Sequence, residues 1–127
     1  MKRIIPLLLA MLLVLSGCAG TATENTYQQS TQEAAKTMMD TQEVIVLDVR
    51  EQDEFDAGHI PGAVLLSVGS ITKDTAAAVI PDLDAVVLVY CRSGNRSKTA
   101  SQSLVDLGYT QIYEFGGIKD WPYEVER

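Results

Sequence analysis

The sequence is poor in the residues from which most metal and redox sites are built. Its 127 residues include 2 cysteines, Cys18 and Cys91, and 1 histidine, His59. Zinc sites are usually built from about three or four cysteine, histidine or carboxylate ligands, and most of the usual cysteine and histidine ligands are missing here. We therefore expect neither a metal site nor a bound cofactor.

Positive charge is also scarce. The chain has 10 lysines and arginines against 17 aspartates and glutamates, which gives a formal net charge of −7 at pH 7. An acidic protein is repelled by nucleic acid and by anionic lipid. No basic stripe with interleaved aromatic side chains is present, so nucleic-acid binding is not expected.

The N-terminus carries an apolar run that is too short to cross a bilayer as a mature helix. The run covers residues 4–15, follows Met1-Lys2-Arg3, and is interrupted only by Pro6. A basic start, a short apolar body and small residues after it are typical of a secretory signal peptide. A buried helix of a cytosolic protein is the alternative interpretation.

The four residues that follow, LSGC at 15–18, resemble the lipobox of bacterial lipoproteins. The resemblance implies cleavage after residues 1–17 and lipid attachment to the sulfur of Cys18. The protein would then be an exported lipoprotein, anchored in a membrane through its acyl chains alone and facing the periplasm or the cell exterior. Residues 18–29 are small and polar after the cysteine, which favours a flexible tether, and residues 30–127 would form the domain.

Lipidation of Cys18 would leave Cys91 as the only free thiol, so no disulfide could form within the chain. An unpaired thiol is a liability in an oxidising compartment unless it is buried or used. Cys91 is therefore either a core residue or a nucleophile.

Apolar runs and helical patterns alternate along the rest of the chain. The order predicts a single α/β domain, with a central parallel sheet of about five strands and helices on both faces. A capping-box pattern, STQE at residues 30–33, marks the first helix. Helices are expected at residues 30–40, 51–57, 70–80 and 97–107, and strands at 44–49, 63–66, 86–90 and 112–115, with a short edge strand at 27–29.

In a parallel α/β sheet, functional sites lie beyond the carboxyl ends of the strands. Asp48, Arg50, Ser67 and Cys91 all follow or end a strand, so they are expected at that edge. His59 lies between a helix and the next strand, which predicts the opposite edge. A cysteine–histidine pair of the thiol-protease kind is thereby excluded. A structural histidine bonded to its own turn is favoured.

The stretch VVLVYCRSGNRS, at residues 86–97, gives the thiol a distinctive setting. The chain leaves an apolar strand at Cys91, curls, and enters a helix near Ser97. Backbone N–H groups of such a loop form an anion nest, and Gly94 allows the left-handed turn that the curl needs. Arg92, Arg96 and Lys98 add positive charge. These features favour a thiolate, whereas a plain core cysteine leaves the concentration of charge unexplained.

The loop CRSGNRS resembles the active-site loop of the rhodanese family. Three further segments agree: VLDVR at residues 46–50, EF at 54–55 with GHIPGA at 58–63, and GGI at 116–118 with Trp121. The resemblance covers about residues 30–123 and implies an α/β sulfurtransferase.

In that case Cys91 would attack the outer sulfur of a donor such as thiosulfate and hold it as a persulfide. Cyanide in an assay, a small thiol or a protein thiol would then remove the sulfur. The resemblance implies that the loop residues hold the substrate and that Asp48 and Arg50 brace the loop; the substrate-binding set is Arg92, Ser93, Gly94, Asn95, Arg96 and Ser97.

Two other functions remain open. Cysteine phosphatases place five residues between cysteine and arginine, but only four separate Cys91 from Arg96. The shorter loop favours sulfur transfer, since a phosphate ester needs a wider ring of N–H groups. A persulfide carrier or sensor that depends on a protein partner cannot be separated from an enzyme by sequence.

Overall fold

The computed structural model describes residues 26–127. The predicted signal peptide, Cys18 and most of the predicted tether lie outside the described residues. Within the described part, no helix combines the length and apolar character needed to cross a bilayer.

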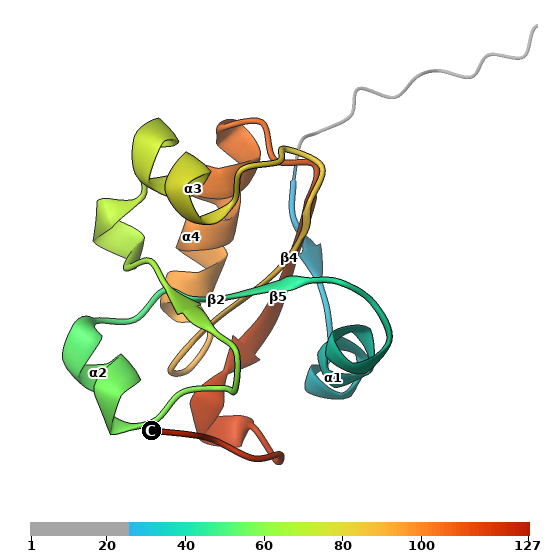
Figure 1. The fold of residues 1–127 in the computed structure, drawn as a ribbon, viewed down its shortest axis with the longest axis vertical. Coiled ribbons are helices and arrows are strands. Elements are labelled where there is room, and N and C mark those ends of the chain that lie inside the picture. The colour runs from blue at the N-terminus through green and yellow to red at the C-terminus, as the bar shows by residue number, and fades with distance from the viewer. Residues whose placement is uncertain (1–25) are drawn as a thin grey trace, which may run out of the picture.

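Five strands form one sheet in the order β1–β5–β4–β2–β3, and all neighbouring strands run parallel (Figure 1). This confirms the predicted α/β sheet, with the most apolar strand, β4, at its centre. The strands are β1 Gln28–Gln29, β2 Ile45–Asp48, β3 Val64–Leu65, β4 Val86–Cys91 and β5 Gln111–Gly117.

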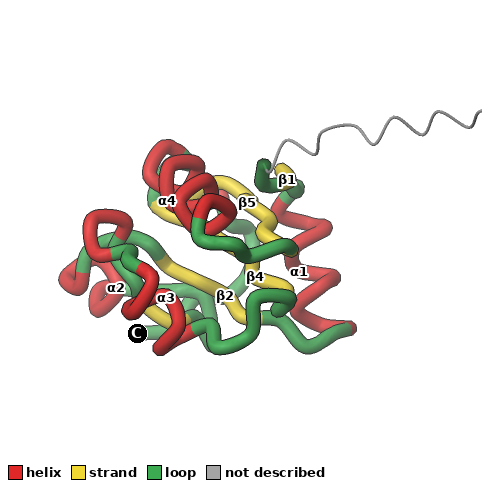
Figure 2. Tube along the Cα trace, turned by 90° about the horizontal axis from the view of Figure 1, so that it is seen from above, coloured by secondary structure: helices red, strands yellow, loops and turns green. Residues whose placement is uncertain are grey.

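Helices cover both faces of the sheet, as predicted, with α1 on the side opposite α3 and α4 (Figure 2). Val87 and Val89 of β4 point into one core together with Ala100 of α4, whereas Leu88 points into the other with Ala35 of α1. The helices are α1 Gln32–Thr41, α2 Gln52–Ala57, α3 Lys73–Val79 and α4 Asn95–Asp106, with short 3₁₀ helices η1 Val68–Ser70 and η2 Ile118–Asp120.

The ends of the elements differ from the predictions by a few residues. The cap of α1 is Thr31, whose hydroxyl accepts the N–H of Ala34 at 3.0 Å, one residue after the expected start at Ser30. The helix predicted at residues 70–80 is shorter in the structure. Thr72 caps α3, which begins at Lys73, and Ser70 belongs to η1. Gln28 and Gln29 pair with β5, which confirms the edge strand and places these two residues in the domain rather than in the tether.

Candidate active site

Cys91 is the last residue of the central strand and is 1% exposed. Its side chain belongs to the core between the sheet and α4. The N–H of Gly94 donates to the sulfur at 3.0 Å, and the thiol donates to the Ser97 hydroxyl at 3.4 Å. The sulfur is therefore held between a backbone donor and a side-chain hydroxyl at the start of α4.

The turn around the sulfur depends on Gly94, which caps α4 with a φ of 104°. A non-glycine residue rarely adopts this left-handed conformation. α4 begins at Asn95, two residues before the predicted start, so the thiol lies closer to the positive end of the helix than expected.

The immediate surroundings favour the thiolate form of Cys91. Burial raises the pKa of the thiol, but the hydrogen bond with the Ser97 side chain and those from the N–H groups of Ser97, Gly94 and Ser93 outweigh it. The pKa of Cys91 therefore lies below its ordinary value. Because the thiolate is the reactive form, this shift favours Cys91 as a nucleophile.

The neighbouring strand fixes the position of the loop. β5 shifts its register against β4, so that Val89 pairs with Glu114 but Cys91 pairs with Gly117. A Cβ added to Gly117 would overlap the carbonyl group of Arg92 and the nitrogen of Ser93. The sequence offered residues 116–118 only as part of the rhodanese resemblance and did not predict this close approach.

Arg96 is engaged by a carboxylate that the sequence did not assign to the site. Its Nη1 and Nη2 donate to the two carboxylate oxygens of Glu54 at 2.7 and 2.9 Å. The bond from Arg96 lowers the pKa of Glu54 to about 2, and the same pair raises the pKa of Arg96. Arg96 is thus half-buried and neutralised, while the side chains of Arg92 and Lys98 are exposed.

Asp48 and Arg50 brace a different part of the edge from the one predicted. Arg50 Nη2 donates to Asp48 at 2.7 Å and to the carbonyl of Gly58 at 2.7 Å, and the Tyr90 hydroxyl donates to Asp48 at 2.6 Å. Ser67, also expected at this edge, donates to the carbonyl of Arg50 at 2.6 Å. These bonds fasten the chain near Gly58 and the end of β4, rather than the loop 92–97.

His59 has the structural role that the sequence favoured, although its predicted position was wrong. Its Nδ1 lies 2.8 Å from the carbonyl of Phe55, its ring stacks on that of Phe55, and its Nε2 lies 3.4 Å from Glu126. The adjacent Ile60 N–H donates to the hydroxyl of Tyr90 at 3.1 Å. The segment therefore lies beside the carboxyl end of β4 and not at the opposite edge.

Glu114 is a second carboxylate that sequence reasoning missed. It is 2% exposed, and the hydroxyl of Ser97 donates to its Oε2 at 2.5 Å. The available signal was its place in strand β5. By the alternation of a strand, Glu114 shares a face with buried Ile112, where an apolar residue is usual.

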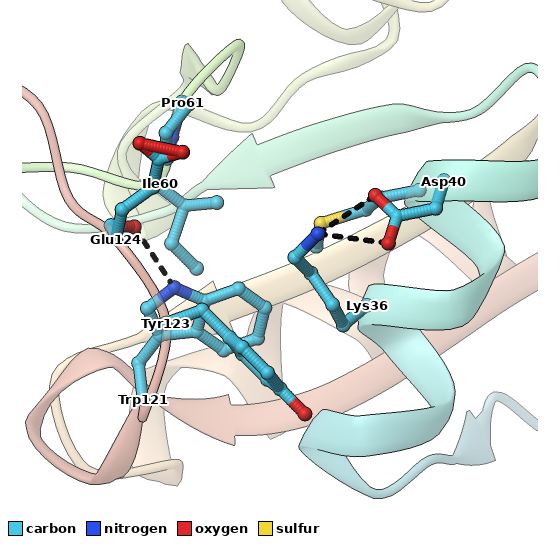
Figure 3. Close-up of a pocket in the computed structure, with 8 residues that line it drawn as sticks. Lys36, Asp40, Ile60, Pro61, Trp121, Tyr123 and Glu124 are labelled. Atoms are coloured by element: carbon cyan, nitrogen blue, oxygen red, sulfur yellow. Dashed lines mark hydrogen bonds and ion pairs between the residues drawn. The ribbon is translucent and has the colours of Figure 1, made fainter.

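Two recesses differ in their relation to the thiol. A cavity of about 270 Å³ lies between α1 and the C-terminal segment, where the ion pair of Lys36 and Asp40 faces Trp121 (Figure 3). A second, of about 520 Å³, borders the active-site loop at Ser93 and Gly94 and reaches Glu114. Only the second adjoins the loop that holds Cys91. Within residues 26–127, no cluster of three metal-ligating side chains was found.

Comparison with known proteins identifies the family. The family model described as "Rhodanese-like domain" matches residues 31–123. The chain belongs to this family. It is 40% identical over 81 residues to the thiosulfate sulfurtransferase GlpE of Pseudomonas fluorescens, covering 63% of this chain and 72% of the relative.

A curated relative and a solved structure from Escherichia coli agree with this family. The chain is 34% identical over 74 residues to the thiosulfate sulfurtransferase PspE, covering 58% of this chain and 70% of the relative. A solved structure described as "rhodanese with anions from E. coli" superposes with a TM-score of 0.62 at 29% identity, covering 67% of this chain and 99% of that one. The relatives support a sulfurtransferase type of rhodanese domain.

Proposed function

We propose that this rhodanese domain is a thiosulfate sulfurtransferase that carries sulfur on Cys91. The observation that carries the proposal is the buried thiol of Cys91, held by the N–H of Gly94 at 3.0 Å at the N-terminus of α4. A thiolate in such a ring of donors is suited to nucleophilic catalysis with a covalent intermediate.

The proposed reaction has two balanced steps. The Cys91 thiolate attacks the outer sulfur of thiosulfate, a new sulfur–sulfur bond forms, and sulfite leaves with the electrons of the broken bond. The terminal persulfide sulfur then carries the negative charge beside the amides of Ser93 and Gly94. Cyanide or a thiolate takes that sulfur, and the Cys91 thiolate is restored.

Thiocyanate formation from thiosulfate and cyanide tests this proposal with small substrates alone. Turnover above that of a Cys91→Ser blank is expected. A well-folded protein that forms the persulfide but turns over only with a protein thiol would instead be a partner-dependent carrier. Hydrolysis of an aryl phosphate without persulfide would favour the phosphatase alternative.

Arg92 rather than Arg96 is expected to attract the donor anion, because Glu54 neutralises Arg96. Arg92→Ala should raise the KM for thiosulfate about fivefold, which corresponds to about 1 kcal/mol for an exposed charge, with little change in kcat. The effect should shrink as salt is added, because exposed charges are screened. Lys73→Ala is the matched control, since it removes an exposed positive charge from α3, and Lys73 does not line the recess beside the loop. An equal rise in both variants would show a general effect of net charge.

We also propose that the protein is a membrane-anchored lipoprotein, on the strength of the basic start, the short apolar run and the LSGC segment at residues 15–18. Its domain would face the periplasm or the cell exterior. Lipid on Cys18 would hold it at the membrane, since multiple acyl chains give stable anchoring.

Cys18→Ser should move the domain from the membrane fraction to the soluble fraction or stall its processing. Fractionation and the mass of the mature chain check this. Cys91→Ser is the control and should stay in the membrane fraction. An unlipidated wild-type protein that fractionates like Cys18→Ser would contradict lipidation.

A further inference from the structure

The most unusual polar group near the site is the buried carboxylate of Glu114. Its oxygens accept the Ser97 hydroxyl at 2.5 Å, the N–H of Gly116 at 2.9 Å and the amide of Gln29 at 3.4 Å. None of the ion pairs found in residues 26–127 includes Glu114. Taking an isolated charge out of water is costly, so a carboxylate placed here without a cation points to a role in the site.

Ser97 joins this carboxylate to the thiol. The Cys91 thiol donates to Ser97 Oγ at 3.4 Å, and the same hydroxyl donates onward to Glu114 Oε2. A hydroxyl carries one proton and can accept another, so its two hydrogen bonds can reverse direction together. The three side chains therefore form a continuous path for one proton.

We propose that Glu114 takes the proton of Cys91 through Ser97, so that the thiolate forms without a change of net charge in the buried site. The S–H bond breaks and its proton goes to Ser97 Oγ, while the original Ser97 proton goes to Glu114 Oε2. The products are a thiolate, an unchanged hydroxyl and a carboxylic acid. Glu114 is thus a positioning residue that acts on the sulfur through Ser97.

This role deepens the proposed function, and it rests on that function for its purpose. In the thiosulfate cycle the thiolate is regenerated at each turnover, so the transfer prepares the resting enzyme for its first attack. In the thiolate state, Ser97 donates its proton to the sulfur. That direction of the bond is the one that lowers the pKa of Cys91.

The path predicts a particular pH dependence. Two groups that share one proton titrate as a pair, so the fraction of thiolate stays nearly constant with pH until the shared proton is joined by a second. Without the carboxylate, Cys91 titrates alone, and its thiolate falls about tenfold per pH unit below its own pKa.

The other charged side chains near Cys91 and Glu114 are either paired with an opposite charge or exposed. Arg96 is paired with Glu54, and Arg92, Lys98 and Asp120 are exposed to water, which screens them.

Thiolate ultraviolet absorbance of the full chain tests the proposal, with the spectrum of Cys91→Ser subtracted at each pH to remove Cys18 and the tyrosines. In the wild-type protein, the thiolate absorbance should have a flat region on the acid side, where it stays nearly constant with pH. Glu114→Gln, which keeps the shape of the side chain, should lose it and fall about tenfold per pH unit. Asp120→Asn removes an exposed carboxylate from the same recess and should match wild type.

Glu114→Asp separates a proton path from a simple charge effect. Aspartate keeps the charge but withdraws the oxygens from Ser97, so its profile should resemble that of Glu114→Gln. A Glu114→Gln profile that coincides with wild type, or that moves to lower pH as expected if Glu114 only repelled the thiolate, would overturn the proposal. Since the readout needs no thiosulfate, failure of sulfur transfer would leave this result interpretable.

Discussion

Cys91→Ser should reduce thiocyanate formation to the level of the buffer blank. A serine hydroxyl cannot form a persulfide. Neither Ser97 nor Glu114, the two residues linked to the sulfur by hydrogen bonds, can replace the thiol as a sulfur carrier. The polar surroundings of the sulfur, including the Gly94 N–H at 3.0 Å, should accept a hydroxyl, so the fold should be retained. Thermal unfolding and the activity assay, measured on the same preparation, check both expectations.

Residual turnover in folded Cys91→Ser would show that sulfur is carried elsewhere. Cys18 is the obvious candidate, so Cys18→Ser is assayed beside it. Cys18→Ser should retain full activity with thiosulfate and cyanide in solution, because Cys91 carries the sulfur.

Gly117→Ala should lower kcat/KM about 100-fold or more, although Gly117 lies on β5 and not in the active-site loop. The added methyl group would overlap the backbone of Arg92 and Ser93, so the loop must move. A displacement of about 1 Å at a reacting group can cost about 100-fold in rate. The N–H of Gly94 would then no longer aim at the sulfur.

Gly69→Ala is the matched control, because a Cβ at Gly69 meets no atom within 4 Å. It should leave activity unchanged. The pKa of Cys91, followed by its thiolate absorbance, should rise in Gly117→Ala as backbone donors are lost. Wild-type activity and an unchanged thiolate profile in Gly117→Ala would show that the loop does not depend on this contact.

The parts of the fold that follow local rules were predictable. β4 is a run of buried apolar residues, and Gly94 permits the turn after it, so the position of Cys91 at the end of a central strand could be predicted from the sequence. Local signals also gave α1 and α4 to within two residues, which is the usual uncertainty of helix ends.

Contacts between distant segments were not predictable. Glu54 and Arg96 are 42 residues apart, and Ser97 and Glu114 are 17 apart, so no local pattern pairs them. The position of His59 was wrong because α2 has only 6 residues. At 1.5 Å per residue such a helix spans about 9 Å, too little to carry the chain to the opposite edge of the sheet.

The measurement that tests the central claim most directly is the intact mass of the full chain after incubation with thiosulfate, followed by cyanide. We expect the addition of one sulfur atom, located at Cys91 by peptide analysis, and its complete removal by cyanide with release of thiocyanate. A folded wild-type protein that gains no sulfur, or gains it equally in Cys91→Ser, would contradict the claim that Cys91 carries sulfur.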